Sequence, residues 1–400
     1  MHDPEKLPYC ADVMIYLDAN ATTPMLPEVM EVMLPWLRER FGNPSSAHRA
    51  GRHARRGIEI ARAQVAALLQ AQPEEIIFTS GATESINTVI SFAQQEWPDR
   101  AVLITSQVEH AVGVEAAERW QDQGGEVRRI PVDEQGLLNL GALEAELKGG
   151  RVALASFIWG NNETGVMTPM SRVVELCHSA GTFVHADAVQ VAGKMPLDVK
   201  AVPVDYLSLS SHKMHGPQGV GVLFVNRNAP FRPLLIGGGQ EAGRRSGTEN
   251  VAGIIGIGQA ASMATAWIAA SGAEQMSALR DDLEIALRQG WSGSRIHGAL
   301  APRLPGTCSI CLPGVDAAAM LIRLDQRGIA CSGGSACHTG SLHPSPVLEA
   351  MGCDASSAAS TLRLSLSRLT TAEDIRRAAQ EILDCARHIQ QQSGSKILGS

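Results

Sequence analysis

The chain has 400 residues, of which 44% are hydrophobic and 19% are charged, so it is long enough for two domains with a large core. Its 34 basic and 41 acidic residues give a net charge of −7, which argues against a direct nucleic-acid partner. Eight cysteines do not make a disulfide framework in a chain this long, and the first residues lack the basic and apolar regions of a secretory signal. We therefore expect a cytoplasmic globular protein.

Short β-rich segments alternate with helical patterns between about residues 74 and 225. The predicted strands are Glu75–Thr79, Ala101–Thr105, Arg151–Phe157, Thr182–His185 and Asp205–Leu209, and the helical runs between them include Ala111–Gln121 and Ser171–Ala180. Such alternation predicts βαβ units and a mainly parallel sheet. Ligands are then expected beyond the carboxyl ends of the strands.

The pattern changes after Gly253. The stretch Ala252–Ala270 carries no charge, but its three glycines and small residues favour a buried or interface helix over a membrane span. Further predicted elements are a helix at Leu279–Arg288, short strands near Cys308–Leu312, a helix at Asp316–Gln326 and a terminal amphipathic helix at Thr371–Gln392. These elements predict a second, smaller α+β domain.

One lysine stands at a turn between two β-rich runs. The run from Asp205 ends at Lys213, and glycines at 216, 219 and 221 precede the next run. The pKa of a lysine falls readily when the side chain is partly buried, and the neutral amine can form a Schiff base with a carbonyl. A solvated lysine in a turn is the alternative.

Polar residues follow four other predicted strands or turns. Thr83 lies where a glycine turn meets a helix start, which suits a phosphate or a simple helix cap. Asp187 could keep a pyridine nitrogen protonated near a Schiff-base lysine, although a cap or an ion pair is the alternative. The amides of Asn161 and Asn162 could hold a carboxylate or a ring oxygen, and His110 could stack on a planar cofactor or move a proton. Together these residues favour a cofactor site.

The chain resembles the cysteine desulfurases of the NifS/IscS type, which are fold-type-I pyridoxal-phosphate (PLP) enzymes. The resemblance runs from Tyr16 to the last helix, in segments that follow the family's order: Tyr16–Pro24, Phe41–His48, Thr79–Glu84, Asn161–Gly165, His185–Gln190, Ser210–Lys213, Arg245–Asn250, Gly334–Cys337 and Leu362–Arg368. It implies an α/β fold with a mainly parallel seven-stranded sheet in a large domain, residues 16–260. Residues 1–15 and 261–400 would form a smaller α+β domain that carries a catalytic cysteine.

The resemblance also implies roles for individual residues. Lys213 would bind PLP, Asp187 would face the pyridine nitrogen, Gln190 would contact the ring hydroxyl, and His110 would stack on the ring and move protons. The phosphate would be held by Ala82 through its backbone, Thr83, Ser210, His212 and, in a homodimer, Thr248 from the other subunit. The residues implied for the substrate carboxylate are Asn162, which would also contact the cofactor, and Arg363, whose guanidinium fork matches a carboxylate bidentately.

Cys337 lies in a segment of small residues, which suits a nucleophile that moves in and out of a site. The resemblance implies that Cys337 takes the sulfur of L-cysteine as a persulfide, that L-alanine leaves, and that the sulfur passes to an acceptor protein such as an iron–sulfur scaffold. No structural metal is expected, and contact of Cys337 with an iron–sulfur cluster during transfer stays open. A thiol with a pKa near 8.5 is only about 3% thiolate at pH 7, and protonated His338 would raise that fraction.

Several positions depart from the family's pattern: Ser211, Cys331, His338–Thr339 and His343–Pro346. Most of them lie around Cys337, so they put the acceptor and the substrate preference in question. A selenocysteine lyase or C–S β-lyase on the same scaffold is the first alternative. A non-catalytic docking platform and a zinc or redox protein that uses Cys308 and Cys311 are the others.

Overall fold

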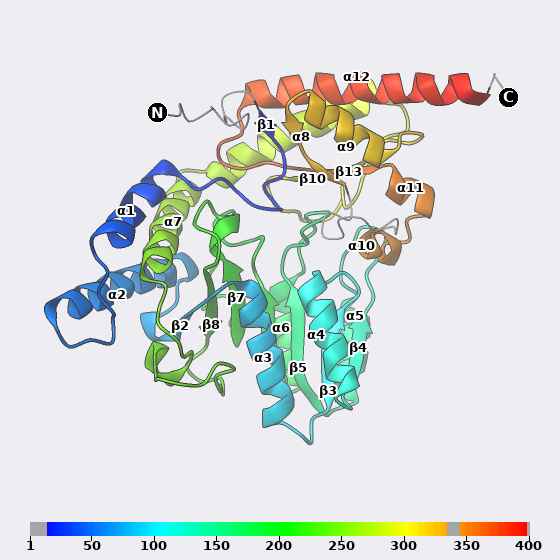
Figure 1. Cartoon of the computed structure of the whole chain (residues 1–400). Helices are drawn as coiled ribbons and strands as arrows, with labels where there is room; N and C mark the ends of the chain where they lie inside the picture. Colours follow the sequence, from blue (N-terminus) through cyan, green and yellow to red (C-terminus); the bar gives the residue numbers. More distant parts are fainter. Residues whose placement is uncertain (1–13, 334–344, 398–400) are drawn as a thin grey trace.

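The computed structural model describes residues 14–333 and 345–397. A seven-stranded sheet in the order β2-β8-β7-β6-β5-β3-β4 forms its centre (Figure 1). The strands are β2 Ile76–Thr79, β3 Val102–Ser106, β4 Glu126–Ile130, β5 Val152–Ile158, β6 Phe183–Asp187, β7 Tyr206–Ser210 and β8 Gly221–Val225. All neighbours from β7 to β4 pair in parallel, and only β8 runs antiparallel to the strands beside it. The prediction of a mainly parallel, seven-stranded sheet is confirmed.

The predicted strands fall within one or two residues of the observed ones, but β4 (Glu126–Ile130) was not predicted. It lies at the edge of the sheet and pairs only with β3. Only Ile130 of its residues is fully buried. By contrast, every residue of β5 is buried, because that strand lies in the middle of the sheet. Because β4 is an edge strand with a mostly polar sequence, it lacks the continuous apolar run that predicts a buried strand.

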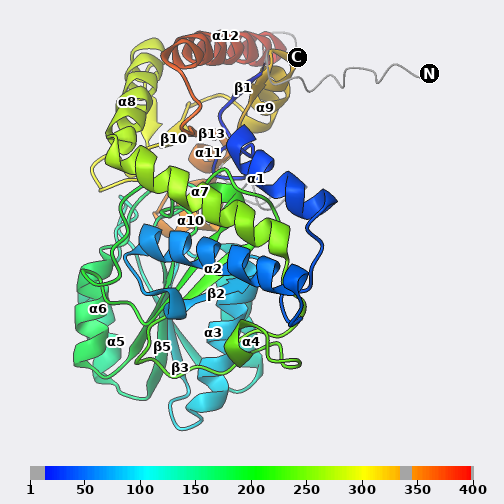
Figure 2. The same ribbon diagram turned by 90° about the vertical axis from the view of Figure 1, so that its left-hand side faces the viewer.

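Helices cover both faces of the sheet, as Figure 2 shows. One face packs on residues of α2 (Arg49–Leu69), α5 (Leu140–Lys148), α6 (Met170–Ser179) and α7 (Val251–Ala269). The other face packs on α3 (Ala82–Glu96) and α4 (Ala111–Asp122). The helices expected at Ala111–Gln121 and Ser171–Ala180 correspond to α4 and α6.

Helix α7 is the uncharged segment for which the sequence predicts a buried or interface helix rather than a membrane span. Among the described residues it is the one helix long and apolar enough to span a bilayer, and half of it is buried inside the fold. It packs on α1 (Pro27–Arg38) and α2. A Cβ at Gly256 would lie 2.6 Å from Met33 Sδ, and one at Gly258 would lie 2.6 Å from the Cα atom of Ala61. The small residues of α7 therefore serve close helix packing in the core.

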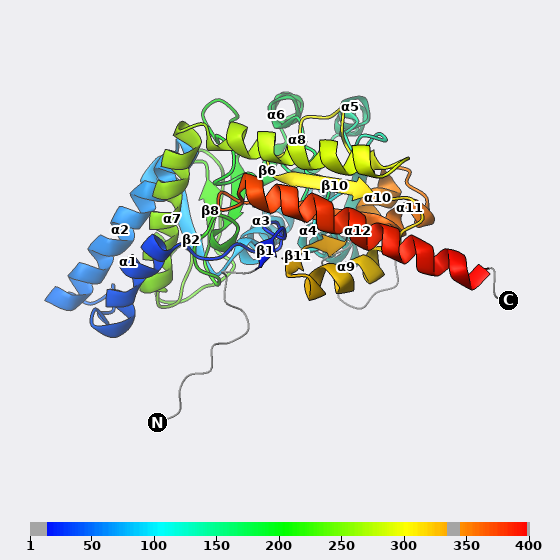
Figure 3. The same ribbon diagram turned by 90° about the horizontal axis from the view of Figure 1, so that it is seen from above.

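The remaining elements form a C-terminal lobe above the sheet domain in Figure 1. A four-stranded antiparallel sheet is built in the order β12-β13-β10-β9 from β12 Ser332–Gly333, β13 Thr361–Ser365, β10 Thr307–Cys311 and β9 Arg295–Ile296. Figure 3 shows α8 (Gly272–Gly290) and α12 (Ala372–Ile397) side by side over β10, with α9 (Ala317–Gln326) beside them. Cys308 and Cys311 both lie buried on β10.

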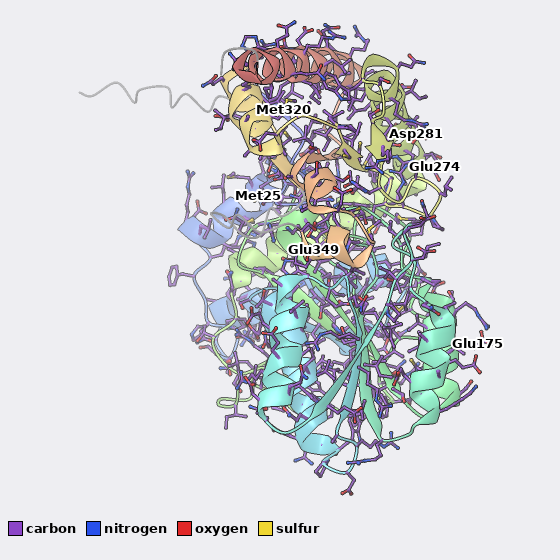
Figure 4. The ribbon with its side chains drawn as sticks, turned by 90° about the vertical axis from the view of Figure 1, so that its right-hand side faces the viewer. Met25, Glu175, Glu274, Asp281, Met320 and Glu349 are labelled. Atoms are coloured by element: carbon purple, nitrogen blue, oxygen red, sulfur yellow. The ribbon has the colours of Figure 1, made fainter. Side chains whose placement is uncertain are left out.

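Segments from both ends of the chain help to join the lobe to the sheet domain, besides the link from α7 to α8. β1 (Ile15–Tyr16) pairs in parallel with β11 (Ile329–Ala330), and the chain then runs into the sheet domain. The short helices α10 (Pro346–Ala350) and α11 (Ala355–Ala359) pack on Val108. Figure 4 shows α10, with Glu349, at the level where lobe and sheet domain meet.

Candidate active site

A cavity of about 640 Å³ opens at the carboxyl ends of β5, β6 and β7, next to the amino end of α3. Residues from the C-terminal lobe and from the segment after β1 close its other side. Nearly all of the predicted site residues line this one cavity: Ala82, Thr83, His110, Asn162, Asp187, Gln190, Ser210, His212, Lys213 and Arg363. Parallel strands end at the same edge of a sheet, which is why residues so far apart in sequence meet here.

Of the described residues that were predicted for the site, Thr248 is the one that does not line the cavity. Thr248 is exposed and lines a smaller hollow of about 180 Å³, which shares Ser80 and Gly219 with the main cavity. Cys337 lies outside the described residues.

Lys213 ends the short turn that follows β7 and projects into the cavity. Its Nζ atom donates to the backbone carbonyls of Asn20 at 2.7 Å and Ala21 at 2.5 Å. The side chain is half-buried. The segment after β1 therefore holds the amine at the cavity wall.

The amino end of α3 is suited to hold an anion. Gly81 precedes the helix and has no side chain to cap it, and Ala82 and Thr83 line the cavity. A Cβ at Gly221 would lie only 2.6 Å from the Cα of Gly81, so glycine at 221 lets β8 pass directly beside this turn. Backbone N–H groups and the helix dipole at such an end favour a phosphate.

His212 and Ser210 line the same cavity. Burial and the nearby Lys213 cation lower the pKa of His212 to about 4, so its imidazole is neutral at physiological pH. Nδ1 of His212 lies 3.0 Å from the Thr22 hydroxyl. When Nδ1 accepts from that hydroxyl, Nε2 carries the ring proton and can donate it in a hydrogen bond to an anion.

Asp187 ends β6 on the floor of the cavity. Its carboxylate accepts the backbone N–H of Val189 at 3.0 Å. Burial raises its pKa to about 6, while this hydrogen bond and the Lys213 cation act in the opposite direction. A buried carboxylate of this kind matches a cationic ring nitrogen.

His110 is both the N-cap of α4 and a wall of the cavity. Its Nδ1 accepts the backbone N–H of Val112 at 3.2 Å, so the neutral ring carries its proton on Nε2. Burial and the Lys213 cation lower its pKa. Beside it, Glu109 accepts the backbone N–H of Ile158 at 2.9 Å, and burial raises the Glu109 pKa to about 8. That carboxyl therefore adds little negative charge near Asp187 at neutral pH.

Arg363 on β13 forms the lobe side of the site and is only 1% exposed. One guanidinium nitrogen donates to Asp18 at 2.8 Å and another to the Asn162 carbonyl at 3.2 Å. Its Nε is buried without a hydrogen-bond partner among the described residues. An unpaired buried N–H is costly, so the site is suited to an additional acceptor such as a carboxylate.

Sequence reasoning gave no role to Asn20, although it lies within one of the quoted segments. Its carbonyl accepts from Lys213 and from Gln190 Nε2 at 2.9 Å, and its Nδ2 donates to the Asn162 carbonyl at 3.1 Å. Asp18, Glu109 and Lys194 were likewise not predicted. For Asp18 and Asn20, the only signal in the sequence was the polar run that follows β1. Nothing in that run indicated which residues they contact.

The donor set fits PLP. A half-buried lysine amine, a buried carboxylate, an uncapped helix start and a neutral imidazole converge on one cavity. These are the groups that a Schiff-base aldehyde, a pyridine nitrogen, a phosphate and a planar ring each require. Among the described residues, no group of three or more His, Cys, Asp or Glu side chains is placed to hold a metal ion.

Comparison with known proteins agrees with this geometry. The family model for aminotransferase class-V matches residues 15–378. A cysteine desulfurase from Enterobacter agglomerans is 44% identical over 371 residues, which cover 92% of each chain. A solved NifS-like protein superposes with a TM-score of 0.87 at 36% identity and covers 93% of this chain and 98% of its own. SspA, solved in complex with cysteine, has a TM-score of 0.78 at 31% identity and covers 89% of this chain and 99% of its own.

Proposed function

The chain belongs to the class-V aminotransferases and, within them, to the PLP-dependent cysteine desulfurases, and from that premise we propose how its residues remove sulfur from L-cysteine. The convergence of Lys213, Asp187 and Arg363 on one cavity carries the proposal. PLP supplies an electron sink for charge that develops at the substrate Cα. The binding and proton-transfer roles described below belong to this chain's own residues.

Each wall of the cavity has a binding role. Lys213 is the covalent attachment residue, Asp187 pairs with the ring nitrogen, and Gln190 faces the ring hydroxyl. The phosphate lies at the α3 amino end, held by Ala82, Thr83, Ser210 and His212. The low pKa of His212 keeps it a neutral donor there.

Arg363 binds the substrate carboxylate together with Asn162. The buried, unpartnered Nε of Arg363 supports this role, because a carboxylate satisfies it and adds a charge-assisted bond. Asp18 holds the guanidinium from the far side at 2.8 Å. The solved relative SspA was obtained with cysteine, which supports L-cysteine as the substrate here.

Lys213 and His110 move the protons. Lys213 Nζ, freed from the cofactor when substrate is bound, takes the proton from the substrate Cα. His110 carries its ring proton on Nε2, because Nδ1 is engaged by Val112. Because its pKa is lowered, the imidazole is neutral, and its Nε2–H can donate a hydrogen bond to charge that develops beside the ring and so assist proton transfer there.

Sulfur leaves the substrate through Cys337. The Cys337 thiolate attacks the substrate sulfur, an S–S bond forms, and the electron pair of the broken Cβ–S bond passes to Cβ, which then takes a proton. The net change converts L-cysteine and the Cys337 thiol into L-alanine and a Cys337 persulfide, so atoms and electrons balance. The persulfide sulfur then passes to an acceptor, which we propose is a thiol of a partner protein such as an iron–sulfur scaffold. Contact of Cys337 with a cluster during that transfer is part of the same proposal.

We also propose that the enzyme works in the cytoplasm as a homodimer. Thr248 is exposed in its own chain and lies outside the main cavity, so a second subunit could use it to complete a phosphate site.

The cofactor part of the proposal is tested by Lys213→Ala. The purified wild type should show a visible absorbance band and form alanine from cysteine. The purified variant should lack that band and should form no alanine. A variant that keeps the band and the activity would overturn the role of Lys213 and would favour a non-catalytic or different role for the cavity.

A further inference from the structure

A second lysine, Lys194, lies buried beside the site and has no part in the steps above. It ends a turn that follows β6, and Gly193 just before it has φ +74°. A Cβ at Gly193 would lie 2.6 Å from the Cβ of Met214, the residue after Lys213. The glycine therefore lets this turn pack directly against the turn that carries Lys213, and this packing places Lys194 beside the cavity.

Lys194 is 6% exposed, and its amine contacts two amide oxygens. Nζ donates to Gln190 Oε1 at 2.7 Å and to Asn20 Oδ1 at 2.9 Å. Neither partner is a carboxylate, although an unpaired buried ammonium is normally unfavourable. A neutral amine also has two N–H donors, so both contacts persist whether or not the group is protonated. Such a costly placement calls for a functional explanation.

The contacts of Lys194 fix which end of the Gln190 amide faces the cavity. With Oε1 on Lys194, Nε2 donates to the Asn20 carbonyl at 2.9 Å. A flipped amide would place its NH₂ against the lysine amine and its oxygen against the Asn20 carbonyl, so both hydrogen bonds would be lost. The observed orientation leaves the second N–H of Nε2 for the cavity that Gln190 lines.

We propose that Lys194 is a positioning residue that locks the Gln190 amide with its N–H donor toward the ring hydroxyl of the cofactor. This inference rests on the proposed function, because it needs the cofactor ring to lie against Gln190. Lys194 would act through Gln190 and touches neither substrate nor cofactor. The rival explanation is that Lys194 only fastens Asn20 and the segment after β1, or acts as a charge at a distance.

A double-mutant cycle on the holoenzyme separates these explanations. The cycle compares wild type, Lys194→Met, Gln190→Met and the double variant, and methionine matches the size of both side chains without an N–H donor. The measured quantity is the pH midpoint at which the visible band changes. Loss of an N–H donor on the ring oxygen leaves its negative charge less stabilised, so the chromophore should keep its proton to higher pH. Melting of the apoproteins, followed in parallel, reports any structural damage.

Lys194→Met should raise the midpoint by about one pH unit, which is about tenfold in proton affinity, and should add little in the Gln190→Met background. An equal shift in both backgrounds would show that Lys194 acts independently of Gln190, as a charge or through Asn20, and would overturn the proposal. So would an unchanged midpoint. If Lys194→Met does not fold, Lys194→Gln takes its place, and a smaller shift that also vanishes in the Gln190→Met background is expected. A wild type without a Lys213-dependent band would refute both the proposed function and this inference. A normal band whose pH midpoint shows no coupling between Lys194 and Gln190 would refute this inference alone.

Discussion

The Nδ1 atom of His110 accepts the backbone N–H of Val112 at 3.2 Å, so one imidazole caps α4 and lines the cavity. The hydrogen bond fixes the ring's tautomer and places the remaining proton on Nε2. To separate the helix cap from the role of His110 in the cavity, a substitution must keep the cap and remove the imidazole. Asparagine provides it, because it is among the best helix caps but cannot stack or relay a proton as an imidazole does.

We expect His110→Asn to keep the stability of the wild type within about 1 kcal/mol and to lower kcat for alanine formation by about 10²-fold. Urea unfolding and steady-state kinetics check the two parts. His48 provides a matched control, since its side chain caps α2 by accepting from Gly51. His48→Asn should leave kcat unchanged. An equal loss of kcat in both variants would mean that the effect of His110 comes through helix capping.

Arg363→Lys should weaken substrate binding far more than cofactor binding. Lysine keeps the positive charge but cannot offer the guanidinium fork, and a charge-assisted bidentate contact contributes about 1.5–3 kcal/mol. KM for L-cysteine should therefore rise roughly tenfold to a hundredfold, while the visible band of the holoenzyme stays in place. Arg280→Lys, on a half-buried arginine of α8 that contacts the Leu304 carbonyl, is the control and should leave KM unchanged.

Asp187→Asn should remove the charge that faces the ring nitrogen without disturbing the local turn. The Asn side-chain oxygen can still accept the Val189 N–H, which Asp187 accepts at 3.0 Å. We expect kcat to fall by about 10²-fold or more and the visible band to shift. Asp205→Asn is the control. Asp205 lies just before the amino end of β7, away from the cavity, and likewise accepts a backbone N–H, that of Val184 at 2.7 Å. A wild-type spectrum in Asp187→Asn would contradict the assignment.

His185 gives the fold a measurable acid sensitivity. It lies fully buried on β6 between the hydroxyls of Ser156 at 2.8 Å and Ser208 at 2.9 Å, and burial lowers its pKa to about 3. It stays neutral in the folded chain but takes up a proton in the unfolded chain below about pH 6.5, so folding stability is lost as pH falls from 6.5 toward 3.

The expected loss from His185 is about 2 kcal/mol between pH 8 and pH 5, since each pKa unit corresponds to about 1.4 kcal/mol. His185→Gln cannot be charged in either state and should lack this component. Urea unfolding of both proteins at the two pH values gives the difference directly. A stability gap between wild type and His185→Gln that stays constant with pH would show that His185 is protonated in the fold as readily as in the unfolded chain.

The sheet domain was predictable because its central strands are buried on both faces and therefore read as apolar runs. β4 escaped prediction because it is an edge strand with one fully buried residue. In the site, Lys213, Asp187 and His110 could be found because each chemistry-bearing residue lies at the end of its own strand or shortly after it. Their meeting in one cavity then follows from the parallel order of those strands.

The supporting residues could not be predicted from the sequence in the same way. Asn20 acts through its backbone carbonyl as well as its side chain, and no side-chain pattern marks that property. Lys194 reads as an ordinary lysine in a turn, and only the packing of that turn, with Gly193 against Met214, brings its amine to Asn20 as well as to the nearby Gln190. Contacts of this kind depend on three-dimensional packing between segments that are remote in sequence.

The central claim is that Cys337 takes the sulfur atom, and peptide mass analysis after mixing the holoenzyme with L-cysteine, without an acceptor thiol, tests it most directly. We predict that the peptide containing Cys337 gains one sulfur atom, that about one alanine forms per sulfur bound, and that Cys337→Ala shows neither the gain nor sustained sulfur release. Release of sulfide at the full rate by Cys337→Ala, or sulfur found on Cys331 in the wild type with none on Cys337, would contradict the account.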